Sequence, residues 1–185
     1  MSSDEKDQDI VPFIEKYVIL LLGSMERPVP SPVHLQKEIF ILSRAVKKIE
    51  DYIVFEKHYF GPYSVDLDNA SKDPTYYPSA YNYTRNGYEL TDKGHEYFFR
   101  IVNANKDNDK FQDFLAIVRM VRELYDVLSQ DELLFLVYST YGEDYTRFSS
   151  VSKKLLEPKK AKEIAKGLLS KGMITKSRYE ELVRN

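Results

Sequence analysis

The sequence predicts an α+β protein, mainly α-helical, in which a winged helix-turn-helix domain is followed by a C-terminal helical segment. Two observations indicate this fold class. Gly61-Pro62 interrupts a β-rich run and precedes Ser64, which can cap a short helix over 65–70. The turn signal 85–87 then separates two tyrosine-rich runs, as in a hairpin, and Thr91 can cap the following helix. Helix, turn, short helix, hairpin and helix succeed one another in the order of a winged helix.

Two longer helices are expected before this motif. A wide apolar stripe predicts a central core helix over 10–24, with Glu15 and Lys16 on the opposite side. The polar, acidic residues 1–9 before it are expected to form a disordered tail.

Ser31-Pro32 predicts the start of a second helix, with Ser as the cap and Pro in the first turn. This helix is expected to place Lys47 and Lys48 in its last turn, where cations complement the helix dipole. Residues 52–55 then predict a short strand that leads into the Gly-Pro motif.

The C-terminal half predicts further helices. After the helix that begins near Thr91 and runs to about 103, the longest regular apolar rhythm covers 111–128. Ser129 to Glu132 forms a capping box that starts a helix over 131–141, and Gly142 is expected to end it. The segment 148–156 is ambiguous. Pro158 opens another helix that Gly172 ends, and Thr175 caps a last short one. The predicted division is a tail over 1–9, a winged-helix domain over 10–104 and a C-terminal helical region over 105–185.

Composition narrows the range of functions. The absence of cysteine excludes disulfides, thiolate metal sites and a cysteine nucleophile, which suits a cytoplasmic protein. The longest apolar run, 17–22, is far too short for a membrane span, so no membrane partner is expected. The net charge of −2 conceals an asymmetry, because residues 150–185 carry ten Lys/Arg against four Glu. Either this basic tail seeks a partner, or it simply packs on an acidic body.

Sequence signals for an enzyme are absent. The chain contains no Gly-rich phosphate loop, no nucleophile elbow and no metalloprotease helix motif. His34, His58 and His95 are far apart in sequence, and none has a second ligand at metal-binding spacing. We therefore expect a non-enzymatic protein with no catalytic residues, no metal and no cofactor.

Double-stranded DNA is the default partner of a winged helix. The expected recognition helix, however, carries Asp66, Asp68 and Asp73 against Lys72, which is the wrong sign for approaching phosphates. Lysines of the tail, including Lys162 and Lys166, provide a second candidate face. The predicted nucleic-acid contacts are Lys37, Tyr63, Ser64, Asn69, Lys72, Arg85, Asn86, Lys93, Lys153, Lys154, Lys159 and Lys160.

Three segments carry a family resemblance. Leu35-Gln36-Lys37, then 59–64 (YFGPYS), then 88–94 (YELTDKG), resemble the YwgA-like winged-helix proteins of archaea and bacteria. More distantly, the chain is similar to the Panacea-type antitoxin domain, and 168–182 resembles short SHOCT-like C-terminal hairpins. The sequence departs from the pattern where Pro74 shortens the helix after Ser64 and 75–83 replaces its continuation. The resemblance implies regulation or partner binding and supplies no catalytic residue.

Two functions remain open at this stage. The first is a DNA-binding transcription regulator that forms a homodimer through the long helix 111–128. The alternative is a protein–protein interaction module, antitoxin-like or a scaffold, that kept the fold without DNA binding. Its contacts are expected at Tyr63, Tyr77 or Tyr81.

Overall fold

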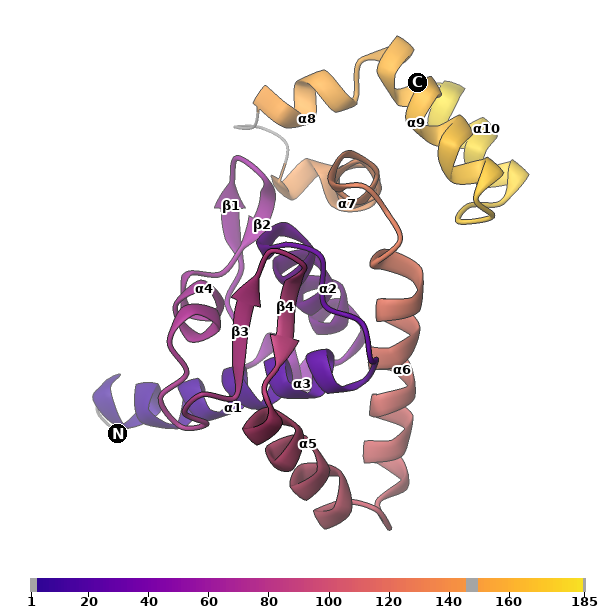
Figure 1. Cartoon of the computed structure of the whole chain (residues 1–185). Helices are drawn as coiled ribbons and strands as arrows, with labels where there is room; N and C mark the ends of the chain where they lie inside the picture. The colour runs from indigo at the N-terminus through magenta and orange to yellow at the C-terminus, as the bar shows by residue number, and fades with distance from the viewer. Residues whose placement is uncertain (1–2, 146–149, 185) are drawn as a thin grey trace. The chain divides into compact units, whose positions relative to one another are not determined.

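The computed structural model describes residues 3–145 and 150–184, which fold as two compact units (Figure 1). Unit 1 comprises the described residues of Met1–Phe55 and Ser64–Asp126, and unit 2 those of Glu56–Tyr63 and Val127–Asn185. These units do not follow the division expected at residue 104, which stays a prediction. The long helix expected over 111–128 forms at Asp109–Tyr125 and belongs to unit 1, and a hairpin between residues 56 and 63 belongs to unit 2.

Unit 1 is mainly helical with one hairpin. Its elements are α1 (Ser3–Gly23), α2 (Pro32–Ala45), α3 (Lys47–Glu50), α4 (Val65–Lys72), β3 (Tyr81–Thr84), β4 (Gly87–Leu90), α5 (Asp92–Ala104) and α6 (Asp109–Tyr125). Unit 2 contains β1 (Glu56–His58), β2 (Gly61–Tyr63), α7 (Gln130–Tyr145), α8 (Ser150–Leu155), α9 (Pro158–Ser170) and α10 (Lys176–Arg184). The expected α+β, mainly helical class is confirmed for the described residues.

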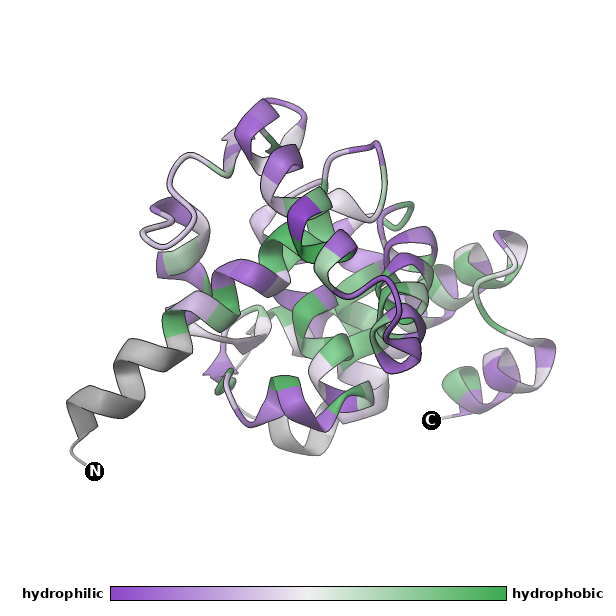
Figure 2. Cartoon of the chain, turned by 90° about the horizontal axis from the view of Figure 1, so that it is seen from below, coloured by the Kyte–Doolittle hydropathy of each residue, from purple (hydrophilic) through white to green (hydrophobic). Residues whose placement is uncertain are grey.

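The core of unit 1 forms around α1, which packs against α4, α5 and α6. Apolar residues gather where the helices pack together, and hydrophilic residues lie on the outward turns (Figure 2). The helix is central, as expected, and it begins at Ser3, inside the segment expected to form a tail.

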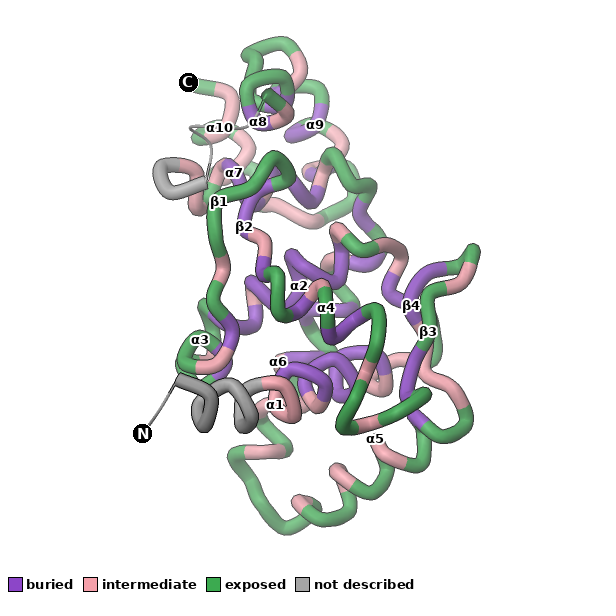
Figure 3. The backbone as a smooth tube through the Cα atoms, turned by 90° about the vertical axis from the view of Figure 1, so that its left-hand side faces the viewer, coloured by how far each residue is buried: buried purple, intermediate pink, exposed green. Residues whose placement is uncertain are grey.

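The second helix is more deeply buried than its sequence suggests. Ser31 caps α2 through a hydrogen bond from His34 N to its Oγ (3.3 Å), as predicted. Most of the helix is buried in the tube view (Figure 3). It ends earlier than expected because Val46 is extended (φ −128°, ψ 97°), and Lys47 begins the separate α3.

The strand predicted over 52–55 does not form. Residues 53–55 have no regular structure, and Ile53 is buried in the core of unit 1. The strand begins four residues later than predicted, at Glu56, where the chain enters the β1–β2 hairpin. Within this segment Ile53 is buried, whereas Val54 is 67% exposed, so the apolar run does not reflect strand pairing.

The predicted hairpin around 85–87 is confirmed. Strands β3 and β4 pair antiparallel, with Tyr81 opposite Leu90 and Thr84 opposite Gly87. Val29, between α1 and α2, extends this pairing through reciprocal backbone hydrogen bonds of 2.9 Å with Tyr88. Gly87 has φ +123°, and a Cβ there would lie 2.1 Å from the Val29 carbonyl oxygen. The glycine therefore permits both the turn and the close approach of a third chain segment.

Local signals also place the helices of unit 2 correctly. Ser129 and Glu132 form the expected capping box, with Ser129 N donating to Glu132 Oε2 at 2.8 Å. Regular helical geometry in α7 is interrupted at Tyr141, but the helix continues to Tyr145, so the end predicted at Gly142 is wrong. Gly172 ends α9 with φ +70°. Within the ambiguous segment 148–156, residues 150–155 form α8, and residues 148 and 149 lie outside the described residues.

The β1–β2 hairpin is held to α7 within unit 2. The Tyr138 hydroxyl donates to the Tyr59 carbonyl oxygen at 3.0 Å, and strand β2 packs on the same helix. The Gly-Pro motif is thus part of an excursion that leaves unit 1 after Phe55 and returns at Ser64. Across the described ranges 3–145 and 150–184, no helix combines the length and apolarity needed to cross a membrane.

Candidate functional site

Helix α4 presents an acidic surface, and hydrogen bonds at its N-terminus hold the helix in place. Ser64 Oγ accepts from Leu67 N (3.3 Å), while the Ser64 backbone exchanges hydrogen bonds with the side-chain amide of Gln36 on α2. The first turn of α4 carries Asp66 and Asp68, and Lys72 forms an ion pair with Asp68 at 2.5 Å. Most of the charge that α4 exposes is therefore negative.

The structure separates the predicted contacts of unit 1 into buried and exposed groups. Lys37 is 1% exposed and Ser64 is equally buried, so neither offers a phosphate contact in this structure, and these two assignments are withdrawn. Those that remain exposed are Asn69, Lys72, Arg85, Asn86 and Lys93. Lys93 lies over the Tyr97 ring, with Nζ 5.7 Å from its centroid.

Tyr63, the remaining contact predicted near this motif, belongs to unit 2. It is partly buried and stacks on His58, with 4.6 Å between the ring centroids. This stacking joins β1 to β2.

The tail lysines lie on two successive helices of unit 2. Lys153 and Lys154 occupy the last turn of α8, and Lys159 and Lys160 follow in the first turn of α9. Lys160 is only partly exposed and lies 3.4 Å from the carboxylate of Glu163. The exposed lysines of this set, called the lysine face below, are Lys153, Lys154, Lys159, Lys162 and Lys166. In the described part of the chain, no carboxylate lies within ion-pair distance of any of these five.

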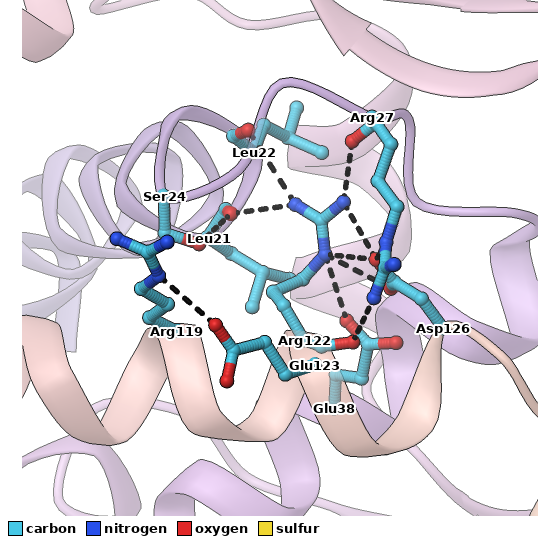
Figure 4. Close-up of polar contacts among 9 residues, drawn as sticks. All are labelled: Leu21, Leu22, Ser24, Arg27, Glu38, Arg119, Arg122, Glu123 and Asp126. Carbon is cyan, nitrogen blue, oxygen red and sulfur yellow. Dashed lines mark hydrogen bonds and ion pairs between the residues drawn. The ribbon is translucent and has the colours of Figure 1, made fainter.

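A buried polar cluster holds α6 within unit 1 (Figure 4). The Arg122 guanidinium is fully buried and bonds the Asp126 carboxylate through Nε at 2.9 Å. It also donates to the carbonyl oxygens of Leu21 at the end of α1 and of Arg27 in the following loop. Arg27 returns a hydrogen bond to Asp126 at 2.8 Å. A cation at the C-terminus of α1 satisfies carbonyls that have no helical partner.

Glu38 of α2 lies beside this cluster, with both carboxyl oxygens buried. Its Oε2 is 3.8 Å from Arg122 Nε. Burial, reinforced by the Asp126 carboxylate, raises the pKa of Glu38 well above its ordinary value despite the attraction of Arg122. A protonated Glu38 can donate a hydrogen bond to Asp126, whereas two ionised carboxylates contain no donor. The cluster therefore combines an Arg122–Asp126 ion pair with a buried Glu38 carboxyl whose pKa is raised.

A second buried carboxylate organises the loop after α4. Glu15, expected on the exposed side of α1, is completely buried, which corrects that expectation. It accepts hydrogen bonds from the backbone N–H groups of Thr75, Tyr76 and Tyr77 at 2.8 to 3.0 Å. The segment that replaces the continuation of α4 is thus held to α1 by one side chain.

The sequence analysis did not predict these buried charged residues, although the sequence contains a signal for Glu38 and Arg122. Glu38 follows Leu35 by three residues and precedes Leu42 by four, so it falls on the apolar face of α2. Arg122 follows Val118 by four residues on α6 in the same way. A charged residue in the middle of an apolar stripe indicates a buried polar interaction.

Among the described side chains, those of residues 11–142 and 150–184, no three His, Asp or Glu side chains are grouped so that they could hold a metal ion. Comparisons with family models, with curated proteins and with solved structures found no match. The resemblance to the YwgA-like family accordingly stays a prediction.

Proposed function

We propose that this chain is a non-enzymatic winged-helix regulatory protein that binds double-stranded DNA through the lysine face of unit 2. The order of α1, α2, α4, the β3–β4 hairpin and α5 supports a winged-helix assignment for unit 1. Val29 adds a third pairing segment to that hairpin. The connection between α2 and α4 is unusual, since it carries α3 and the excursion into unit 2, where a helix-turn-helix has a short turn.

We choose between the two candidate DNA-binding surfaces by comparing the charged side chains that have no ion-pair partner. Affinity for DNA rests largely on Lys and Arg side chains that neutralise phosphates. On α4, the position of a recognition helix, Lys72 is engaged with Asp68 and the neighbouring carboxylates repel phosphates. On α8 and α9, five exposed lysines have no carboxylate partner among the described residues. The lysine face is therefore the stronger candidate for phosphate contact.

Fluorescence anisotropy of a labelled mixed-sequence duplex, titrated with the full chain at rising salt, tests this function. We expect a dissociation constant on the order of 10⁻⁴ to 10⁻⁶ M with a clear salt slope. The variant Lys153→Gln/Lys154→Gln/Lys159→Gln should weaken binding and reduce the slope by roughly one for each phosphate that is no longer neutralised. The matched control, Lys72→Gln/Arg85→Gln/Lys93→Gln, removes the same charge from unit 1 and should bind like the unaltered protein.

Two results would contradict the proposal in different ways. A flat titration at low salt would exclude DNA binding altogether. A loss of affinity confined to the unit 1 variant would retain DNA binding but move it to the hairpin and α5.

A homodimer contact is proposed on α6. Met120 and Leu124 are 51% and 41% exposed and lie one turn apart, so they present one apolar strip on this helix. Sedimentation equilibrium should give twice the chain mass, and Met120→Glu/Leu124→Glu should give the monomer. A monomeric unaltered protein would show that this strip is not a dimer contact.

The alternative, a protein-interaction module, is favoured by exposed aromatic side chains. Tyr81, one of the expected contacts, is buried, and its hydroxyl donates to the Ala70 carbonyl oxygen at 2.8 Å, so that residue is withdrawn. Tyr76 and Tyr83 are about half exposed instead. If DNA binding fails, the alternative is tested with cross-linking at these two positions. A partner that Tyr83→Ala no longer captures would support it.

A further inference from the structure

Unit 1 contains a cavity of about 460 Å³ that none of the sites above uses. It lies between α1, the α2–α3 junction and the beginning of α6. One wall is aromatic and is formed by Phe13, Tyr17, Phe111 and Phe114. Phe13 stacks on Tyr52 at 4.2 Å, and Tyr17 meets Phe114 edge to face at 5.9 Å. The rings are thus held by neighbours, so the apolar wall is preformed.

The same cavity carries only positive charge. Lys16, Lys48 and Lys110 line it, and none of the described lining residues is acidic. Among the side chains that the structure describes, those of residues 11–142 and 150–184, no carboxylate forms an ion pair with these three lysines. Lys48 Nζ lies 5.9 Å from the centre of the Phe13 ring, which places a cation at the edge of the aromatic wall.

The ammonium groups of Lys16 and Lys48 also repel each other. Burial, and then the charge of Lys48, lower the pKa of Lys16. Asn108, the N-cap of α6, lies at the cavity too, so the positive end of that helix dipole faces the same space. An anion placed there would relieve the repulsion between ammonium groups and meet the helix end. An uncharged ligand would do neither.

We infer that this cavity binds an amphipathic organic anion, with its apolar body on the aromatic wall and its anionic head between Lys16 and Lys48. The volume falls within the range of pockets that hold small organic ligands. The head could be a carboxylate or a phosphate monoester, which the two ammonium groups would recognise by the same chemistry. This inference does not depend on DNA binding, since the lysine face belongs to unit 2.

Calorimetric titration of the full chain with decanoate, decyl phosphate and decanol tests the inference. The probes are used below their micelle concentrations, where the far-ultraviolet circular dichroism of the protein is unchanged. We expect decanoate or decyl phosphate to bind with one-to-one stoichiometry and at least about tenfold more tightly than decanol, which lacks the charge. The tighter of the two anions identifies the head group.

Matched lysine variants locate the site. Lys48→Met should weaken anion binding about tenfold and leave decanol binding unchanged. Lys47→Met is the control, because Lys47 lies next to Lys48 on α3, is also exposed and does not line the cavity. Equal effects of the two variants would overturn the proposed site, as would an affinity for decanol equal to that for the tighter of the two anions. Absence of binding by both anions would overturn the inference as a whole.

Discussion

Arg122 and Asp126 form a buried ion pair one helical turn apart, with 2.9 Å between Nη2 and Oδ2. Because the same guanidinium reaches the end of α1 and the loop at Arg27, this pair connects three segments distant in sequence. It explains why α6 folds with the N-terminal unit although a charged loop separates it from α5. A buried ion pair is not in itself stabilising, but removing one partner leaves the other charge without compensation.

Arg122→Met should therefore destabilise unit 1 by about 3–5 kcal/mol. Arg119→Met is the matched control, because Arg119 pairs with Glu123 on the same helix with the same spacing but at an exposed position. Its effect should stay within about 0.5 kcal/mol. Urea unfolding followed by circular dichroism measures both, and equal losses would show that burial of the Arg122 pair is energetically unimportant.

Glu38 should make stability depend on pH. Its raised pKa means that the folded state keeps a proton that the unfolded chain has already lost above the ordinary value of 4.5. Stability is therefore fully present below that value and is lost as pH rises through the elevated pKa. Glu38→Gln, which stays neutral, should remove this decline. Unfolding free energies from about pH 5 to about pH 9 measure it, and parallel curves for the two proteins would contradict a protonated Glu38.

Lys37 should have the opposite effect on the pH dependence of stability, in an adjoining pH range. Burial lowers its pKa from 10.5 to about 7, so between these values the unfolded chain holds a proton that the folded state lacks. Stability should rise with pH across this range, by up to about 1.4 kcal/mol per pH unit. Lys37→Met keeps the length of the side chain and should abolish the rise. Lys47→Met, at an exposed position, should leave it intact.

Glu15→Gln should detach the loop after α4. The amide presents a donor where the carboxylate accepted several N–H bonds, and we expect a loss of roughly 2–4 kcal/mol. Amide hydrogen exchange should then accelerate at Thr75, Tyr76 and Tyr77. Glu26→Gln, an exposed change of the same kind, should alter neither quantity. Unchanged exchange in Glu15→Gln would show that the loop is held by other contacts.

Gly87→Ala should disrupt the pairing of Val29 with the hairpin. The added Cβ would overlap the Val29 carbonyl oxygen at 2.1 Å, in addition to the strain of a positive φ. Gly172→Ala isolates the strain alone, because φ is +70° there and no atom lies within 4 Å. We expect about 1–2 kcal/mol for Gly172→Ala and a clearly larger loss for Gly87→Ala in thermal unfolding. Similar losses would mean that Val29 moves aside at little cost.

By itself, the sequence determined the features that depend on neighbouring residues. Caps at Ser31, Ser64 and Thr91 and the capping box at Ser129 formed as predicted, because each is a hydrogen bond between residues three positions apart. The hairpin and the ends of most helices followed from the same local chemistry.

Only the tertiary structure decided which charged residues are buried and which segments fold together. Glu15 and Lys37 resemble surface residues in sequence. Glu38 and Arg122 fall on apolar stripes, but the partners or covering elements of all four residues lie elsewhere in the chain. The strand expected over 52–55 did not form because Ile53 joined the core instead. Burial and long-range pairing depend on how elements distant in sequence pack, and the periodicity of one segment contains no information about its neighbours in space.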